Sequence, residues 1–390
     1  MFFLSRRNIT LRIYDFLVIV ALVVVWYGIV PITGAFISRH NWRVFRRRFD
    51  DLRLYPILDY GTCRRLEKEG GVFRFIGGLE SVTDGHTLWI QGEDLTIPAA
   101  LTDAQTYLLP LKEGGENIES FDLGEEAPEK IRWDRVSALA EGARVFVGGA
   151  LVFRNERWSF VSTRETPLLV IFYDGSDRSL TVRTIRAGRH RNEYWNDVTP
   201  YAMIIGAICQ ILIALSFLSR PAFRLTVIVA LVALFTPLLP LVPPGALFTV
   251  LYHRLWWQAR VFRAFRDLAR LPQKYLAPGQ ESCTLPGGEL YGSIRFDALP
   301  PAVREGKAPL LIPEQKTNEW YMFGAISPGH ELPSEPEDPF ATFGVLPGKP
   351  EDLARRYTLK AYTLEIISWL ALLSGIGLNI FFIGMILTLL

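Results

Sequence analysis

Two stretches rich in arginine and aromatic residues carry most of the chemistry in this chain. If helical, residues 39–54 and 253–272 each separate into an apolar face and a basic face. Guanidinium groups bind phosphate, and aromatic rings favour the boundary between lipid headgroups and acyl chains. The pattern predicts two helices in the membrane interface, with these residues in contact with it: Trp42, Arg43, Phe45, Arg46, Arg47, Trp257, Arg260, Phe262, Arg263, Phe265, Arg266 and Arg270.

The same separation of faces has a second interpretation. A helix that packs its apolar face on a β domain of its own chain, with its basic face in water, has the same pattern. The sequence leaves both interpretations open. In the first, each surface arginine contributes about 1 kcal/mol on an anionic leaflet, so a bilayer with anionic lipids is an expected partner.

Four prolines form a second feature, inside the apolar stretch 225–252: Pro237, Pro240, Pro243 and Pro244. Closely spaced prolines remove backbone donors and predict a helix break. In transporters, broken helices expose carbonyl groups that line a cavity or bind ions. The alternative is a kinked helix with an irregular end, which the absence of a charged residue within the stretch favours.

The sequence contains no known catalytic motif. The five histidines are scattered, and no Cys or His spacing is typical of a zinc site. Gly344–Lys349 has the wrong spacing for a phosphate loop. Cys63 and Cys283 could form a disulfide, but small packed thiols are the favoured reading. The sequence therefore predicts no catalytic residue, no cofactor and no metal.

Four stretches lack charge over a length that could cross a bilayer: Phe16–Ser38, Val198–Ser219, Leu225–Tyr252 and Ile366–Leu390. Two of them flank each long polar region. The predicted organisation is a tail and first span (1–38), a basic helix (39–54), a β-rich domain (55–196), a span (197–219), a turn (220–224), a proline-broken span (225–252), a basic helix (253–272), a smaller β-rich domain (273–360) and a last span (361–390).

The two halves of the chain share phrases. The sequence Arg-Val-Phe-Arg at 43–46 returns at 260–263, and Asn155–Phe160 returns loosely as Asn318–Phe323. The chain leaves the membrane after the first and the third predicted spans and re-enters it at the second and the fourth. Both long polar regions therefore lie on the same side. The expected fold is membrane α + β, with four transmembrane helices in two parallel repeats. Each repeat has an interfacial amphipathic helix and a small β-rich domain.

Short runs of β-branched and aromatic residues, separated by turn signals, predict strands in both polar regions. In the first region they are 73–76, 87–91, 96–100, 106–111, 144–152, 158–162, 168–173 and 180–185; in the second they are 282–285, 290–296, 310–313, 320–325 and 341–345. Strands this short and regular are typical of a sandwich or a small barrel. The run 139–148 is similar to a strand pair of an OB-like barrel.

Composition sets the broad class. Hydrophobic residues make up 49 % and charged residues 21 %, which is too polar for an all-membrane bundle and too apolar for an ordinary soluble enzyme. A net charge of +2 does not indicate nucleic-acid binding. The excess of arginine near the loop side of the spans predicts β domains on the cytoplasmic side of a bacterial inner membrane.

The expected function is a non-enzymatic membrane scaffold or assembly protein that binds a protein partner or forms a homo-oligomer. A transporter or channel component is the alternative, and a membrane-associated enzyme is the third hypothesis.

Overall fold

The chain is an α + β protein with two compact units. The computed structural model describes residues 14–66, 70–84, 86–109, 129–132, 142–154, 156–189, 194–276, 280–313, 317–327 and 332–389. Unit 1 contains the apolar helical segments and comprises residues 1–43, 191–259 and 362–390. Unit 2 contains every described strand and comprises residues 44–190 and 260–361.

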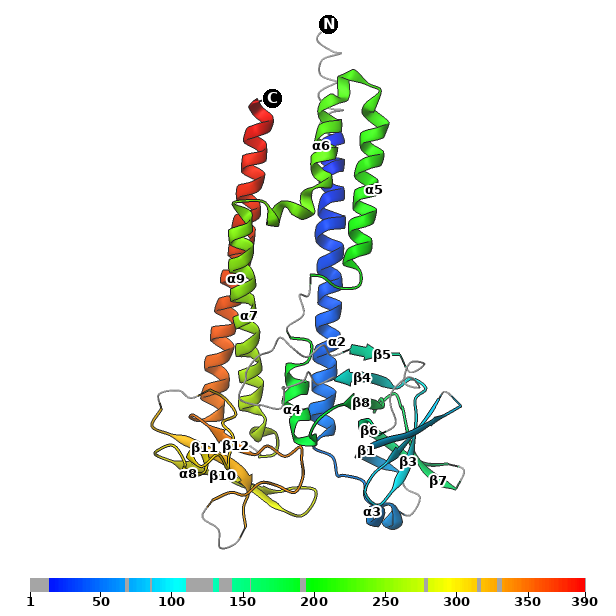
Figure 1. Cartoon of the computed structure of the whole chain (residues 1–390), viewed down its shortest axis with the longest axis vertical. Helices are drawn as coiled ribbons and strands as arrows, with labels where there is room; N and C mark the ends of the chain where they lie inside the picture. Colours follow the sequence, from blue (N-terminus) through cyan, green and yellow to red (C-terminus); the bar gives the residue numbers. More distant parts are fainter. Residues whose placement is uncertain are drawn as a thin grey trace. The chain divides into compact units, whose positions relative to one another are not determined.

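The described elements follow one another along the chain as drawn in Figure 1. The helices are η1 (24–29, a π-helix), α2 (30–52), α3 (60–65), α4 (177–186), α5 (199–218), η3 (221–223), α6 (224–234), η4 (236–241), α7 (245–270), η5 (272–274), α8 (301–304) and α9 (350–389). The strands are β1 (71–83), β2 (87–91), β3 (96–100), β4 (105–109), β5 (129–131), β6 (144–154), β7 (157–161), β8 (169–173), β9 (282–284), β10 (290–296), β11 (320–325) and β12 (344–346).

Five strands of unit 2 close into a barrel. Its order is β1-β2-β3-β7-β6, and β6 pairs again with β1. Closure depends on the length of β1, whose first part pairs with β6 and whose last part pairs with β2, with a register shift between Leu79 and Ser81. Such a shift bends a strand and lets one strand serve two neighbours. The barrel interior is filled by alternating apolar side chains, among them Leu88, Ile90, Ile97, Val145, Val147 and Phe160.

The pair Gly148-Gly149 marks the point where β6 changes partner. Residues 144–148 of β6 pair with β8, and residues 150–154 pair with β7 along the same edge of the strand. A Cβ at Gly148 would lie 2.9 Å from Leu52, and one at Gly149 would lie 2.9 Å from Leu168. The two glycines therefore let a helix and a neighbouring segment approach the strand. Beyond β8, the sheet continues with β4, which is parallel to β8, and then with β5, which is antiparallel to β4.

The second β region is a four-stranded antiparallel sheet of order β12-β11-β10-β9. It differs from the barrel in strand number and connectivity, so the repeat that the shared phrases predicted is not confirmed. One step is similar in both regions: a strand is followed by a glycine with positive φ, Gly175 (85°) or Gly348 (114°), and then by a helix. The three cysteines are free, in agreement with packed thiols.

Two predicted strands, 180–185 and 310–313, are wrong. Residues 180–185 belong to helix α4, although their β-branched composition is typical of a strand. Gly175, with φ of 85°, turns the chain before the helix, and Asp177 lies in its first turn, where the helix dipole favours a negative charge. Leu180 is fully buried, and Ile185 packs in the same cluster as Phe265 of α7. Tertiary burial of this face outweighs the local preference. Similarly, 310–313 forms only an isolated bridge from Leu310 to Val345.

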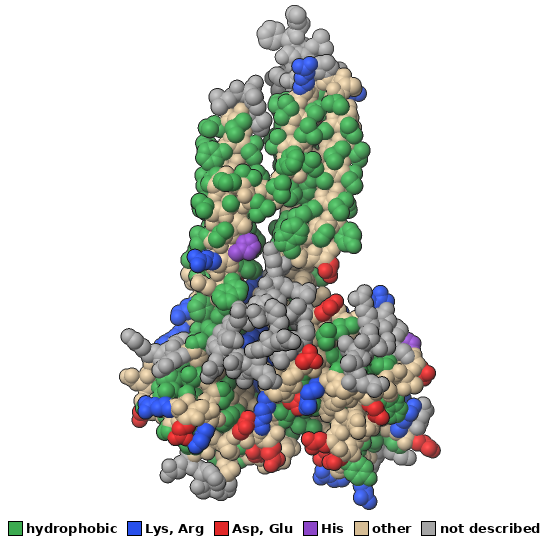
Figure 2. Space-filling view, viewed as in Figure 1, with side chains coloured by type: hydrophobic (Ala, Val, Ile, Leu, Met, Phe, Trp, Pro, Cys, Tyr) green, Lys and Arg blue, Asp and Glu red, His purple; other side chains and the backbone are tan. Residues whose placement is uncertain are grey.

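Three helices are long and apolar enough to cross a membrane: Tyr14–Leu52, Thr199–Leu218 and Pro350–Ile386. Within their most apolar stretches only 17 %, 22 % and 22 % of the residues are buried, so these helices are not the core of a water-soluble protein. Hydrophobic side chains cover them in Figure 2. The prediction of four membrane helices is not confirmed, because the third stretch is divided.

The third stretch consists of the short helix α6, the 3₁₀ segment η4 and the start of α7. Pro237 and Pro240 lie in η4, and Pro243 and Pro244 precede α7. The carbonyl groups around the break have side-chain donors. Asn379 Nδ2 donates to Leu239 O (2.6 Å) and Val242 O (2.9 Å), and Thr249 Oγ1 donates to Pro240 O (2.7 Å). These bonds offset the backbone pairing that the prolines remove.

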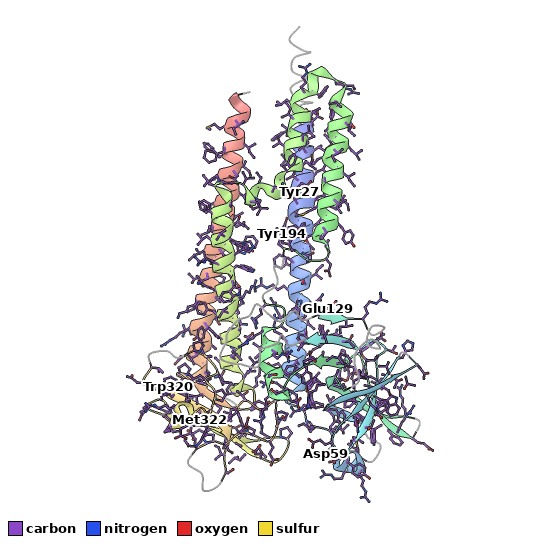
Figure 3. All side chains as sticks on the ribbon, in the orientation of Figure 1. Tyr27, Asp59, Glu129, Tyr194, Trp320 and Met322 are labelled. Carbon is purple, nitrogen blue, oxygen red and sulfur yellow. The ribbon has the colours of Figure 1, made fainter. Side chains whose placement is uncertain are left out.

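Small residues of α5 allow close helix packing within unit 1. Ala202, Gly206 and Ala214 lie four or eight residues apart on its buried face. A Cβ added at Gly206 would lie 2.5 Å from the ring of Tyr27, which is labelled in Figure 3. Tyr194, also labelled there, donates a hydrogen bond to Tyr27 O (2.7 Å). Close approach of this kind is typical of helix pairs in membranes.

Candidate binding groove on the barrel

The first basic stretch is the end of a longer helix, not a separate one. A continuous helix runs from Tyr14 to Leu52. Its apolar face is covered by protein: Phe45 is fully buried against Tyr107, with ring centroids 4.2 Å apart, and Phe49 packs on Phe146 at 5.2 Å. Packing on a β domain of the same chain, the second interpretation of the pattern, therefore describes these rings.

The basic residues of this stretch have separate environments. Arg46 donates to Ala187 O at 2.6 Å, whereas Arg43 and Arg47 are exposed. Trp42 is buried, with 8 % of its surface exposed. Contact of the exposed arginines with lipid phosphate stays a prediction.

The second basic stretch is the last part of α7. Phe265 is buried, and Phe262 and Phe265 pack on Tyr357 of α9 at 5.8 and 5.4 Å. The arginine face is partly used inside the protein, since Arg260 is 5 % exposed and Arg266 is ion-paired with Asp267 at 2.7 Å. Arg263 is partly exposed, whereas Trp257 and Arg270 are exposed. Arg260 and Phe265 are therefore buried inside the protein. Contact of the exposed Trp257 and Arg270 with a membrane stays a prediction.

Two buried arginines that the sequence did not single out hold the barrel and the second sheet together. Arg74 of β1 donates to Tyr55 O (2.6 Å), pairs with Asp338 and lies over the Phe340 ring at 5.2 Å. Arg53 donates to Phe340 O (3.3 Å) and to Leu271 O (3.3 Å). We call Arg53, Arg74, Asp338 and Phe340 the arginine clasp. Both arginines are at most 1 % exposed, so their hydrogen bonds are made without competition from water.

Unit 2 has a groove of about 400 Å³ on the barrel. Helix α3, strand β2 and the beginnings of β3 and β7 contribute its walls. Alternation along β2 buries Leu88 and Ile90 in the barrel and turns Trp89 outward. The groove is lined by Tyr60, Cys63, Arg64, Trp89, Leu95, Thr96, Ile97, Pro98, Arg157 and Trp158.

Helix α3 supplies one wall of the groove. Asp59, labelled in Figure 3, caps its beginning by accepting a hydrogen bond from Thr62 N. Hydrogen bonds from the Thr62 side chain and from Thr62 N hold the pKa of Asp59 below its ordinary value. Tyr60 is 57 % exposed beside it. Burial raises the pKa of the Cys63 thiol, with Asp59 adding to the effect. A thiol of raised pKa is a weak nucleophile at neutral pH, so Cys63 acts here as packing.

The groove lies at the weakest seam of the barrel. Strands β3 and β7, both fully described, are joined by the one parallel pair Ala99–Phe160. At the open end of this seam Trp158 packs on the barrel core and on Phe153 at 5.1 Å. Arg157 lies over the Trp89 ring at 5.5 Å. Two indole rings and a guanidinium group are therefore presented at a place where the backbone pairing is incomplete.

Charges around the groove alternate in sign. Its lining contains Arg64 and Arg157 and no carboxylate. Exposed Glu93 and Asp94 follow β2, and Glu156 directly precedes Arg157. A phosphate backbone requires a continuous basic track, which these carboxylates interrupt.

No group of three or more His, Cys, Asp or Glu side chains lies close enough to hold a metal ion within the described ranges. The sequence did not predict the groove, although one signal could have done so. Trp89 stands at an outward position of an alternating strand, where a large aromatic ring lies outside the barrel core.

Comparisons of the chain with protein-family models, with curated proteins and with solved structures found no match.

Proposed function

We propose that this chain is a non-enzymatic, multi-pass membrane scaffold that binds a protein partner through the barrel groove. The observation that carries the proposal is the groove itself, in which Tyr60, Trp89 and Arg157 surround an incomplete strand seam. Tyrosine, tryptophan and arginine dominate the energetics of protein interfaces. An extended acidic segment would place carboxylates on Arg64 and Arg157 and apolar side chains on the rings.

The barrel class adds support. The closure β1-β2-β3-β7-β6 with a parallel β3–β7 pair is similar to an OB-like barrel, whose second and third strands form a binding face. The groove uses β2 and β3 in the same way. Fold likeness alone does not identify a ligand, so the choice of a protein partner depends on the interrupted charge of the groove rim.

The order of the chain supports placing both β regions on the same face of a membrane. Unit 2 is one compact body made from residues 44–190 and 260–361, and a packed body must lie on one face of a bilayer. Helix α5 leaves that face, so the chain must cross back before residue 260, through α6, η4 and α7. Helix α9 crosses last. The arginine excess near the span ends favours the cytoplasmic face of a bacterial inner membrane.

A photo-crosslinking amino acid at position 60 tests the binding role. With Tyr60 replaced, irradiation of intact cells should join the chain to one main protein partner. The same replacement at Arg304, exposed on α8 of the second β region, is the matched control. Adding Arg157→Glu should remove the adduct at position 60. Equal adducts at positions 60 and 304, or an adduct that Arg157→Glu leaves unchanged, would contradict the proposal.

The adduct also separates the alternatives. An adduct between two copies of this chain indicates a homo-oligomer, and an adduct with nucleic acid would overturn the choice of a protein partner. A reporter fused after Tyr60 should report cytoplasmic exposure, and one fused after Arg220 should report the opposite face.

The alternative of a transporter or channel component rests on the proline break. The side-chain donors from Asn379 and Thr249 to the carbonyl groups of the break favour a structural role for it. Replacing Pro240 and Pro243 by Leu should leave partner binding intact; a specific transport defect in that variant would favour the alternative.

A further inference from the structure

An open hollow lies beside α2 where its apolar part ends. It has a volume of about 460 Å³ and belongs to unit 1. Its lining residues recur at helical spacing, which places them on one face of the helix: Thr33, Phe36, Ile37, Arg39, His40 and Arg43. The other side of α2 is covered here, because Pro31 and Gly34 are buried and Asn196 Nδ2 donates to Pro31 O at 3.0 Å. We call the lined side the lipid face.

The lipid face changes from apolar to basic along the helix axis. Phe36 and Ile37 are 64 % and 56 % exposed, although both are large apolar side chains. Arg39, His40 and Arg43 follow them within two turns, and the described lining contains no carboxylate. Helical side chains tilt toward the N-terminus of their helix, which for these basic residues is the apolar side. Positive charge therefore adjoins exposed apolar surface.

An aromatic cluster in unit 1 indicates the depth of this face in a membrane. Tyr252 of α7 packs on Trp369 of α9 at 6.2 Å, and Trp256 packs on the same ring at 6.1 Å. Such rings collect at the boundary between acyl chains and headgroups. Glu365 precedes Trp369 by about one turn, and its carboxylate lies 3.8 Å from Arg39. If α9 crosses the membrane, Arg39 lies about 6 Å beyond the aromatic level, among lipid phosphates.

The basic groups of the lipid face keep the capacity to bind an anion. A guanidinium group has five N–H donors, so the long contact of Arg39 with Glu365 does not use them all. His40 and Arg43 are exposed. Arginine is well suited to phosphate, because its planar fork can donate two parallel hydrogen bonds to one anion.

We propose that the lipid face binds one anionic phospholipid of the phosphatidylglycerol type. The phosphodiester accepts hydrogen bonds from Arg39 and Arg43 with His40 beside it, and an acyl chain lies on Phe36 and Ile37. A soluble anion would leave the exposed apolar side chains unused, and an uncharged lipid would leave the arginines unused. The proposal rests on the membrane embedding in the proposed function and is independent of the barrel groove.

The test is native mass spectrometry of the full-length protein released from detergent micelles. The protein is titrated with dimyristoyl phosphatidylglycerol or with dimyristoyl phosphatidylcholine, which have the same acyl chains and the same phosphodiester. The first phosphatidylglycerol should bind about fivefold or more tightly than the first phosphatidylcholine, whose ammonium group cancels its charge. The factor corresponds to about 1 kcal/mol for one arginine at an anionic lipid surface.

Arg43→Gln should weaken binding of the first phosphatidylglycerol by about fivefold and change phosphatidylcholine binding little. Because Arg43 is exposed, the unfolding temperature should stay the same. Arg254→Gln is the matched control, since Arg254 is an exposed arginine of unit 1 that follows another apolar stretch and does not line the hollow. It should leave the affinity of both lipids nearly unchanged. Phe36→Ser should weaken both lipids, because both place an acyl chain on this ring.

Three results would overturn the proposal. The first is equal affinity for the two lipids. The second is an equal loss of phosphatidylglycerol binding in Arg43→Gln and Arg254→Gln. The third is displacement of phosphatidylglycerol by millimolar inorganic phosphate, which would describe a site for a free anion.

Failure of the proposed function gives different results. A chain that stays in solution without detergent would overturn the membrane embedding itself. A micelle-bound chain without a lipid preference would overturn the lipid site alone, and the adduct at position 60 would still report on the groove.

Discussion

Removing the charge of Asp338 tests whether the arginine clasp joins the two β regions. Asp338 is 11 % exposed and Arg74 is 1 % exposed, so Asp338→Asn leaves a buried guanidinium group without its counter-ion. Breaking a buried pair in this way costs about 3–5 kcal/mol. Asparagine keeps the Oδ1 acceptor that Phe340 N uses at 3.0 Å, and Arg74 keeps its bond to Tyr55 O. We therefore expect the lower end, about 3 kcal/mol.

For a unit of roughly 250 residues, 1 kcal/mol corresponds to about 2–4 °C in unfolding temperature. The expected decrease for Asp338→Asn is thus about 6–12 °C. Thermal unfolding of the detergent-solubilised protein, followed by tryptophan fluorescence, measures it. Trp320 on β11, labelled in Figure 3, is 4 % exposed in the second β region, so its emission changes when that region unfolds.

The matched control is Asp297→Asn. Asp297 is 90 % exposed and lies 3.6 Å from an exposed Arg295, so its loss should leave the unfolding temperature unchanged. The double variant Arg74→Leu with Asp338→Leu should recover most of the stability, because apolar residues often replace a buried ion pair without loss. A decrease for Asp338→Asn no larger than that of the control would refute the reasoning.

Three further predictions concern other packed groups. Burial opposes ionisation of Asp267, but Arg189 and Arg266 outweigh it and hold its pKa below the ordinary value, so its stabilisation is present above about pH 4 and is lost as pH falls further. Asp267→Asn should therefore lower the unfolding temperature at pH 7, and its difference from wild type should be smaller at pH 3; an equal difference at both values would argue against the pair. Gly206→Leu should separate α5 from the ring of Tyr27 and reduce thermal stability in detergent, whereas Gly28→Leu, which meets no atom within 4 Å, should not. Asn379→Leu should lower the free energy of unfolding by about 1–2 kcal/mol, because it removes the hydrogen bonds from Asn379 Nδ2 to Leu239 O and Val242 O at the proline break. The change is measured as a lower unfolding temperature; no change would show that the break needs no side-chain donor.

Local composition was sufficient to predict most strands of unit 2. Strands β2, β3, β10 and β11 have the predicted bounds, because alternation with a period of two is a local signal. Residues 180–185 show the limit of this signal. Their β-branched side chains are typical of a strand, but one face of them is buried against α7, and that contact is formed only in the folded chain.

The amphipathic helices show the same limit at the level of function. Phe45 and Phe265 were correctly placed on an apolar face, but the sequence could not distinguish a lipid surface from the interior of unit 2 as the place of that face. Both environments select the same residues, since both exclude water. The clasp and the groove escaped prediction because the residues of each are distant in sequence and meet only in the folded chain. The clasp joins Arg53 and Arg74 to Asp338, and the groove brings Tyr60, Trp89 and Arg157 together.

The sequence by itself determined that this is an α + β chain with apolar helices able to cross a membrane, and it located most of the strands. These properties depend on composition and short-range periodicity. Tertiary structure alone decided that β1 closes a barrel and that buried arginines join the barrel to the second sheet. It decided them because each depends on contacts between segments tens to hundreds of residues apart, for which a single sequence contains no local signal.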